Sequence, residues 1–286
     1  MIDPQTHDPI RVSRIVHTIH AVRDVDPCRM EYQDFFGGLV FAEGYFDLED
    51  RDMALLYVGD HMIEPMGPRH ADKTEFAFAR YVHRYGEGWH SFELKVENAK
   101  TAAAKLQAAG CQLASVYDMF FFLRAESTGG VLVEVCDTKM PNDPYDRPNW
   151  NPAWGRGHAS GVVGLSHIVC AVRELDTPLR IFTELFDGKV LSDERVTTPQ
   201  SGRRIVVRLG DTNVAFVCPD AAGSGPLDAF LAKPKACIYA LVWKVEDIAR
   251  SKTAFAARGL GILDDGCIGG AFAVNFRNAR HEFIAG

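Results

Sequence analysis

The feature that most constrains the fold is a repeat that divides the chain into two halves. The segment 17–41 reads HTIHAVRDVDPCRMEYQDFFGGLVF, and 167–191 reads HIVCAVRELDTPLRIFTELFDGKVL. Both begin with His, reach Ala-Val-Arg four residues later and close near a Gly. The stretches that end these units also match, LLYVGDHMIEPMGP at 55–68 and VVRLGDTNVAFVCP at 206–219. Such a repeat indicates that one supersecondary unit is used twice.

A second kind of unit also occurs twice. The segment 92–110, FELKVENAKTAAAKLQAAG, parallels 241–259, LVWKVEDIARSKTAFAARG. Each combines a short alternating strand, a helix and a closing Gly suited to a left-handed helix cap. Short apolar runs with turn residues between them follow, which is typical of hairpins. The chain therefore contains four strand–helix–strands units, over about 12–66, 86–137, 162–218 and 236–284.

The four units group into two domains. Between them lies DTKMPNDPYDRPNWNPAWGRGHASG at 137–161, whose Pro, Asn, Trp and Gly content indicates a linker without regular structure. We expect an N-terminal domain at 1–137, a linker at 138–161 and a C-terminal domain at 162–286. Trp150 and Trp154 are expected to pack against the domains or to rim a pocket.

Composition excludes several function classes. The 286 residues are 47% hydrophobic and carry a net charge of −7, and no run of Lys and Arg suggests a nucleic-acid partner. No apolar stretch approaches the ~18 residues needed to cross a membrane, and the N-terminus has no signal-peptide core. Seven scattered cysteines form no C-x-x-C pair and are expected to be buried free thiols. We expect a cytoplasmic monomer or homodimer whose partner is a small-molecule substrate.

Two segments carry a resemblance to a known family. They are ARYVHRYGEGWHSFELKVEN at 79–98 and FFFLRAESTGGVLVEV at 120–135. With the repeat, they make the chain similar to the vicinal oxygen chelate superfamily, which includes glyoxalase, bleomycin-resistance proteins and extradiol dioxygenases. Residues 12–137 most resemble methylmalonyl-CoA epimerase, whereas the two-half layout resembles the type I extradiol dioxygenases. The resemblance implies an α+β fold in which four βαβββ modules form two domains with curled mixed sheets.

The resemblance also implies a divalent metal ion (Fe, Mn, Co, Ni or Zn) and places its ligands residue by residue. His17 matches the first-strand ligand, Glu64 the ligand that ends unit one, and Glu134 the ligand that ends unit two. Glu134 stands among Val and Leu residues, where a carboxylate is unfavourable unless it is paired or metal-bound. The alternatives are a strand His that faces an empty pocket and an exposed Glu on an edge strand.

The fourth ligand position raises a question of register. The family has a ligand His five residues before the Val of the V-E-N signature, and this chain has Ser91 there. His90 stands one residue early and would face the helix side in a regular strand. A β-bulge after Gly86 and Gly88 would turn it toward the other ligands. His90 is therefore either a metal ligand or a packed histidine.

The second half holds an incomplete copy of this site. His167 repeats His17, but Ala215 stands in place of Glu64 and Ala240 in place of Ser91. Glu282, in a shortened last strand FRNARHEFIAG, stands near the position of Glu134. We expect a structural partner with a degenerate site.

Three functions are compatible with these residues. The first is a metal-dependent isomerase, epimerase or lyase that stabilises an enolate, with Glu134 or the non-ligand Glu93 taking the proton. The second is an Fe(II)-dependent extradiol-type dioxygenase, against which the missing second-half ligands count. The third is a binding or resistance protein without chemistry, which the Ser91 position favours.

Overall fold

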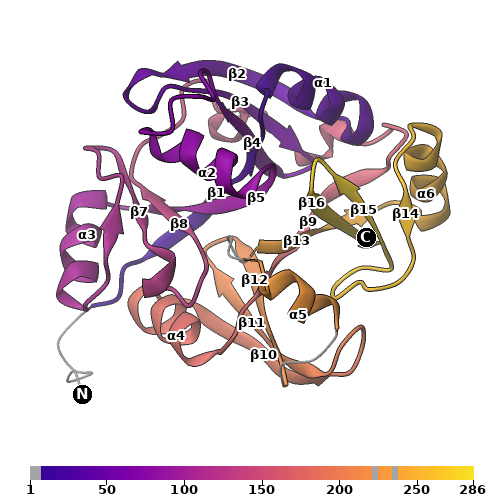
Figure 1. Cartoon of the computed structure of the whole chain (residues 1–286). Coiled ribbons are helices and arrows are strands. Elements are labelled where there is room, and N and C mark those ends of the chain that lie inside the picture. The colour runs from indigo at the N-terminus through magenta and orange to yellow at the C-terminus, as the bar shows by residue number, and fades with distance from the viewer. Residues whose placement is uncertain (1–7, 221–224, 234–237) are drawn as a thin grey trace.

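The computed structural model describes residues 8–220, 225–233 and 238–286, which form two open eight-stranded sheets with helices packed on them (Figure 1). The strand orders are β2-β3-β4-β1-β5-β8-β7-β6 and β10-β11-β12-β9-β13-β16-β15-β14. Each strand number in the second order is eight higher than its counterpart in the first, so the repeat seen in the sequence is also a repeat of topology.

The first sheet is built by residues 12–136. Its strands are β1 (Val12–Ala21), β2 (Leu39–Phe46), β3 (Arg51–Val58), β4 (His61–Pro68), β5 (Gly88–Val96), β6 (Leu113–Ala114), β7 (Phe120–Leu123) and β8 (Val133–Cys136). Its helices are α1 (Val25–Phe36), α2 (Ala77–Tyr85) and α3 (Ala99–Ala108). Two βαβββ modules therefore stand side by side and meet at β1 and β5, which pair antiparallel.

The second sheet repeats this arrangement over residues 162–285. Its strands are β9 (Val162–Ala171), β10 (Lys189–Val196), β11 (Gly202–Leu209), β12 (Thr212–Pro219), β13 (Ile238–Val245), β14 (Ile262–Leu263), β15 (Phe272–Phe276) and β16 (Ala279–Ala285). Its helices are α4 (Asp176–Leu179), which continues as a π-helix over Arg180–Leu185, α5 (Pro226–Leu231) and α6 (Ile248–Ala257). The fold is the expected α+β arrangement of four βαβββ modules.

Local sequence explains where the helices begin and end. The carboxylate of Asp24 accepts a hydrogen bond from the Asp26 amide at the start of α1, and Asn98 caps α3 in the same way through the Thr101 amide. Gly37 ends α1 in the left-handed region, at φ 71°, where a residue without Cβ is favoured. Both helices pack on the side of the sheet that carries the larger apolar core, which we call the outer face.

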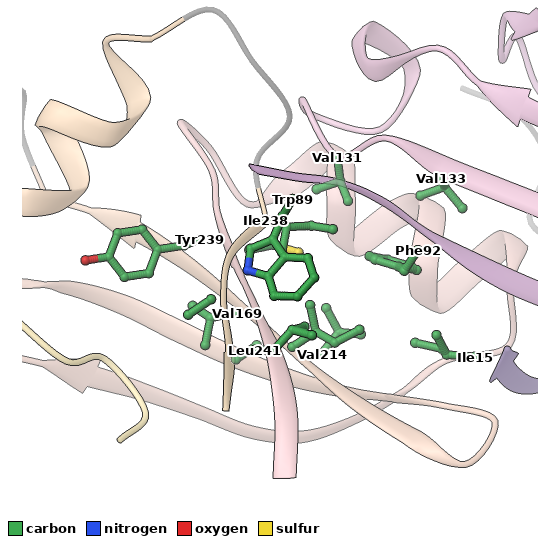
Figure 2. Close-up of a cluster of buried hydrophobic side chains, with 14 of the residues drawn as sticks. Ile15, Trp89, Phe92, Val131, Val133, Val169, Val214, Ile238, Tyr239 and Leu241 are labelled. Atoms are coloured by element: carbon green, nitrogen blue, oxygen red, sulfur yellow. The ribbon is translucent and has the colours of Figure 1, made fainter. Parts of the chain in front are cut away.

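One apolar core joins the outer faces of both sheets. Figure 2 shows Trp89 and Phe92 of the first half beside Val169, Ile238 and Leu241 of the second, within a single cluster of buried side chains. Because this core is shared, the halves are held together by burial of apolar surface.

A second, smaller cluster covers the opposite side of the first sheet, which we call the inner face. It is formed by apolar side chains of the central strands, with Phe78 and Val82 of α2 packed against them. The linker closes one end of this face, because Trp150 packs on Tyr57 with ring centroids 4.7 Å apart and Trp154 Nε1 donates to the Gly59 carbonyl. The expectation that both tryptophans pack against the domains is confirmed.

The segment FRNARHEFIAG was expected to be one shortened strand, and this is wrong. It is a hairpin in which β15 and β16 are joined by Arg277 and Asn278, both at positive φ. Two consecutive left-handed residues form the tight turn that joins antiparallel strands.

The cysteines and helices bear on two further expectations. Six cysteines are free thiols and four of these are buried, whereas Cys237 lies outside the described residues. Within the described parts of the chain, no helix is both long and apolar enough to cross a lipid bilayer.

Candidate metal centre

The four central strands of the first sheet place four ionisable side chains on its inner face. In the order β4-β1-β5-β8 these strands carry Glu64, His17, Glu93 and Glu134 in turn. Glu93 lies directly opposite Glu134 in the parallel β5–β8 pair, and Glu64 lies opposite Ile19 in the β1–β4 pair. The neighbours of these residues on each strand, such as Ile63 and Leu94, face the outer core instead, as strand alternation requires.

The imidazole of His17 lies at the centre of this group. Its Nε2 is 2.9 Å from an oxygen of Glu64 and 3.7 Å from an oxygen of Glu134. Its Nδ1 faces Glu93, at 3.7 Å. One donor atom from each of His17, Glu93 and Glu134 lies within 4.8 Å of the others, which is a spacing that suits a metal ion. Three carboxylates therefore converge on one ring.

These donors are buried and incompletely satisfied. All four residues are between 1% and 4% exposed. Both ring nitrogens of His17, one oxygen of Glu93 and one of Glu134 have no hydrogen-bond partner among the described residues, because the short contact to Glu64 lies outside hydrogen-bonding geometry. Buried polar atoms without partners are rare and unfavourable, so these atoms are suited to bind a cation or to share protons.

The electrostatics of the cluster follow from this burial. Burial alone would lower the pKa of His17, but the three carboxylates outweigh it and raise that pKa well above its usual value. Burial raises the pKa of Glu93 to about 8, although the nearby His17 opposes the shift. An excess of carboxylates in a buried site is the arrangement that a divalent cation neutralises.

His90 lies on the inner face because of a β-bulge. In the β1–β5 pair Ile19 faces Ser91 and His20 faces Trp89, so His90 is the extra residue. Its ring packs among the aromatic rings of Phe78, Tyr81 and Phe122, and its Nδ1 is 2.8 Å from Ser91 Oγ. His90 is not one of the mutually close donors among the described residues, and its role as a ligand stays a prediction.

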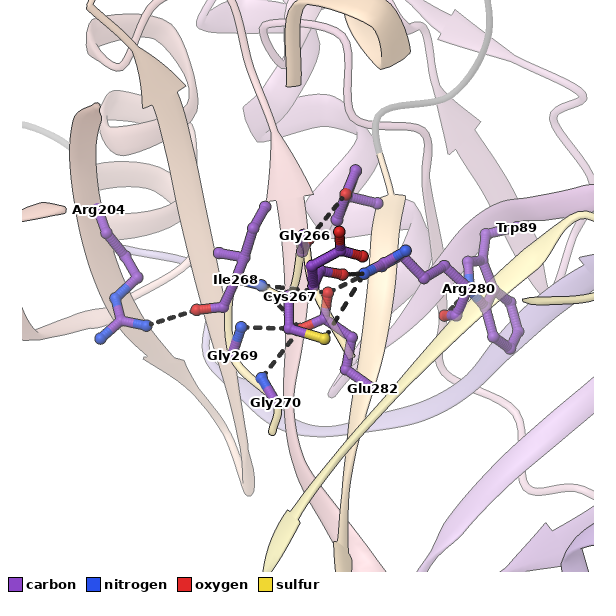
Figure 3. Close-up of polar contacts among 11 residues, drawn as sticks. Trp89, Arg204, Gly266, Cys267, Ile268, Gly269, Gly270, Arg280 and Glu282 are labelled. Carbon is purple, nitrogen blue, oxygen red and sulfur yellow. Dashed lines mark hydrogen bonds and ion pairs between the residues drawn. The ribbon is translucent and has the colours of Figure 1, made fainter. Parts of the chain in front are cut away.

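The second half has the same backbone register but a different site. Val242 lies opposite Glu282 in the β13–β16 pair, as Glu93 lies opposite Glu134 in β5–β8. Figure 3 shows that the Glu282 carboxylate is already satisfied, since it accepts hydrogen bonds from the amides of Ile268, Gly269 and Gly270 and from Arg280 Nε. No orphaned carboxylate oxygen of Glu282 remains to bind a cation.

His167, the repeat of His17, is closed off by the same loop. A side chain added at Gly269 would place its Cβ 2.5 Å from His167 Nε2, so the backbone of this loop lies against the ring. Burial lowers the pKa of His167 to about 4, in the opposite direction to His17. The two halves therefore share a scaffold, and the described cluster of mutually close donor atoms lies in the first half.

Two groups near the candidate site were not recognised in the sequence. Arg51 and Glu49 form a buried ion pair at the start of β3, with Arg51 Nη1 donating to Glu49 over 2.9 Å. In the sequence they lie in an ordinary charged turn, EDRD, which carries no signal of burial. His20 and His61 lie on the outer face, where they contact Tyr32 and Thr18.

The histidine and carboxylate donors fit a divalent metal ion. Imidazole nitrogen with carboxylate oxygens suits ions such as Mn, Fe and Zn. His17 Nε2 and the unpartnered oxygen of Glu134 are donor atoms that such an ion could take up.

Comparisons with known proteins bear on the fold. No protein-family model matches the chain, and no curated protein sequence matches it. Among solved structures, a mutant of 4-hydroxymandelate synthase from Streptomyces coelicolor is similar, with a TM-score of 0.71, 17% identity and coverage of 95% of this chain and 92% of that one. The 2,3-dioxygenase LapB from Pseudomonas sp. KL28 gives a TM-score of 0.61 and 16% identity over 96% and 92%.

A third match covers one half. Methylmalonyl-CoA epimerase from Mycobacterium tuberculosis aligns with 48% of this chain and 95% of its own, at 22% identity and a TM-score of 0.41. The first two matches extend over both sheets, and at their low identities they establish the architecture. The chain shares the fold of these two structures, with two paired-module halves in one polypeptide, as the resemblance to the vicinal oxygen chelate superfamily implies.

Proposed function

We propose that the protein is a metal-dependent enzyme that acts on a small oxygenated organic substrate by enolate-stabilising proton transfer, as an isomerase, epimerase or lyase. The observation that carries this proposal is the set of buried donor atoms around His17 that lack hydrogen-bond partners. In the second half the equivalent carboxylate is satisfied by backbone amides and by Arg280. The contrast supports a functional rather than a structural reason for the unsatisfied cluster.

The two sides of the His17 ring suggest a division of roles. Glu64 and Glu134 face Nε2, whereas Glu93 faces Nδ1. We assign His17 Nε2, Glu64 and Glu134 to hold the ion, with His90 as a further donor if its ring turns away from Ser91. A bound divalent ion would supply Lewis-acid stabilisation of negative charge on a substrate oxygen.

Glu93 is the group that we assign to take and return the proton. Its carboxylate shares the inner face with the ligands and makes no hydrogen bond through Oε1. Facing His17 Nδ1, it also favours the tautomer that leaves Nε2 free to coordinate. Glu134, the other candidate base, is then committed to the ion.

Metal titration of matched variants tests this proposal. We expect wild-type protein to bind about one Mn²⁺, Co²⁺ or Zn²⁺ per chain, and Glu134→Gln to bind at least about ten-fold more weakly. The matched control is Glu282→Gln in the second half, which should bind as wild type does. Equal binding by Glu134→Gln and wild type contradicts the assignment.

A second measurement separates binding from chemistry. In D₂O, the metal-loaded protein is expected to exchange the hydrogen next to a carbonyl in at least one of a panel of small oxo acids and dicarboxylic acids. Proton NMR measures this exchange as the loss of the signal of that hydrogen. Glu93→Gln should keep its metal at saturating concentration and lose this exchange. Full exchange activity in Glu93→Gln rules out its role as the base.

Fe(II)-dependent oxygenation is the second candidate. It is supported by the match of both halves to the dioxygenase LapB and to 4-hydroxymandelate synthase. A catechol-dependent uptake of oxygen that stops when iron is chelated, and that Glu134→Gln abolishes, would favour it over proton transfer. Protein that binds none of these ions favours instead a small-molecule binding or resistance protein.

A further inference from the structure

A cavity of about 350 Å³ opens beside the candidate metal centre. Its walls come from α2 and from the ends of strands β3, β5 and β7, and they include His90, Phe122 and Leu132. Phe122 lies directly opposite Glu134 in the β7–β8 pair, which puts the two side chains about 5 Å apart at Cβ. The cavity therefore ends one cross-strand position from the proposed ligands, although none of the four cluster residues lines it.

Two buried charges line this cavity, Arg51 and its ion-pair partner Glu49. The side chain of Arg51 is only 5% exposed, and the ring of Phe46 lies 5.0 Å from the guanidinium carbon. Nη1 donates to Glu49, whose other oxygen accepts from Tyr117. Nε has no hydrogen-bond partner in the described part of the chain. A guanidinium that is held rigidly and left partly unsatisfied is suited to bind a carboxylate through its planar fork.

Positive charges predominate among the residues that line the cavity. The lining contains four arginines and two glutamates, so the cavity is net positive in a chain whose net charge is −7. Arg84 and Arg124 are exposed at the rim, where they raise the local concentration of anions and are screened by salt.

The remaining wall is aromatic. Phe78, Tyr81, Tyr85 and Phe122 line the cavity together with the His90 ring, and the Tyr81 and His90 rings meet edge to face at 4.4 Å. Aromatic walls favour a flat apolar group, which packs on their faces and edges.

We propose that this cavity binds a small aromatic carboxylic acid, with its carboxylate on Arg51 and its ring against the aromatic wall. That this acid is the substrate rests on the proposed function, whereas the binding itself does not. On that proposed function, the substrate is a small aromatic carboxylic acid.

Calorimetry with phenylacetate and its neutral analogue phenylacetamide tests the inference on chelator-treated, metal-free protein. We expect wild type to bind the acid at least about ten-fold tighter than the amide. In Arg51→Lys, which keeps the charge and loses the fork, this preference should fall several-fold. In the double variant Glu49→Gln/Arg51→Gln, which removes both buried charges together, it should disappear.

Two further variants control for the net charge. Arg124→Gln should weaken phenylacetate binding a few-fold at low salt, and this effect should vanish at high salt. Arg11→Gln, an exposed position outside the cavity, should leave binding unchanged.

Equal affinity for acid and amide in wild type overturns the inference, as does an undiminished preference in both Arg51 variants. If phenylacetate binds only when Mn²⁺ is present and the Arg51 variants bind equally, its carboxylate goes to the metal, so the cavity assignment fails and the proposed function stands. If phenylacetate binds with the expected preference to protein that takes up no metal ion, the cavity assignment stands and the proposed function fails.

Discussion

Replacing Glu93 by Gln should stabilise the metal-free protein, although it removes a group assigned to function. Burial raises the pKa of Glu93 from 4.5 to about 8. Between these values the unfolded chain ionises this carboxyl and the folded chain does not, so stability is full below pH 4.5 and falls as the pH rises toward 8. At about 1.4 kcal/mol per pH unit, the loss at pH 7 is about 3 kcal/mol. Gln has the shape of the protonated carboxyl and does not ionise.

Urea unfolding with a chelator present measures this effect. We expect Glu93→Gln to be more stable than wild type by up to about 3 kcal/mol at pH 7, and equal to it at pH 4. With saturating Mn²⁺ the difference should narrow, because an ion that binds the folded state stabilises it and the carboxylate strengthens that binding. The matched control is Glu97→Gln, at an exposed position just after the same strand, which should change little at either pH.

A Glu93→Gln protein that is less stable than wild type at pH 7 in chelator would refute this reasoning. It would mean that the carboxylate is already satisfied in the absence of a metal ion.

Three other expectations follow from the packing and charges. Burial lowers the pKa of His20 to about 3 and that of His281 well below its usual value. Below pH 6.5 the unfolded chain therefore binds protons that the folded chain excludes, and the folded state loses stability. In urea unfolding, His281→Gln should reduce this loss by about 1.4 kcal/mol per pH unit. Phe36→Ala, in the core shared by the two halves, should lower the free energy of unfolding by about 3–5 kcal/mol. Gly269→Ala should lower it by about 1–3 kcal/mol, since its Cβ would meet His167, while Mn²⁺ titrates as in wild type.

The architecture could be predicted because the repeat records it twice. Four similar units with matching strand–helix boundaries leave few alternative arrangements, and the observed strand orders repeat as the sequence does. The β15–β16 hairpin was missed because Arg277 and Asn278 adopt positive φ without the Gly that usually signals such a turn.

The site was harder to predict because it depends on register. Strand alternation places His17, Glu64 and Glu134 on one face, as expected, but the side on which His90 lies depends on a one-residue bulge. That bulge recurs in the second half, where Tyr239 is skipped between Ile238 and Ala240. Comparing the repeats by sequence cannot detect a bulge that both halves share.

The buried Arg51–Glu49 pair shows a second limit. Both residues belong to a run of charged residues that reads as a solvated turn, and only the tertiary packing of Tyr117 and the nearby phenylalanines buries them. Long-range packing of this kind has no local signal in the sequence.

Anomalous scattering from crystals grown with Mn²⁺ tests the central claim most directly, because it locates the ion among the side chains. We expect one strong peak per chain on the inner face of the first sheet, bounded by His17, Glu64 and Glu134, and none beside Glu282. The same map would show whether the His90 ring turns toward the ion. No peak at saturating Mn²⁺, or a peak only in the second half, would contradict the claim that the first-half cluster is a metal centre.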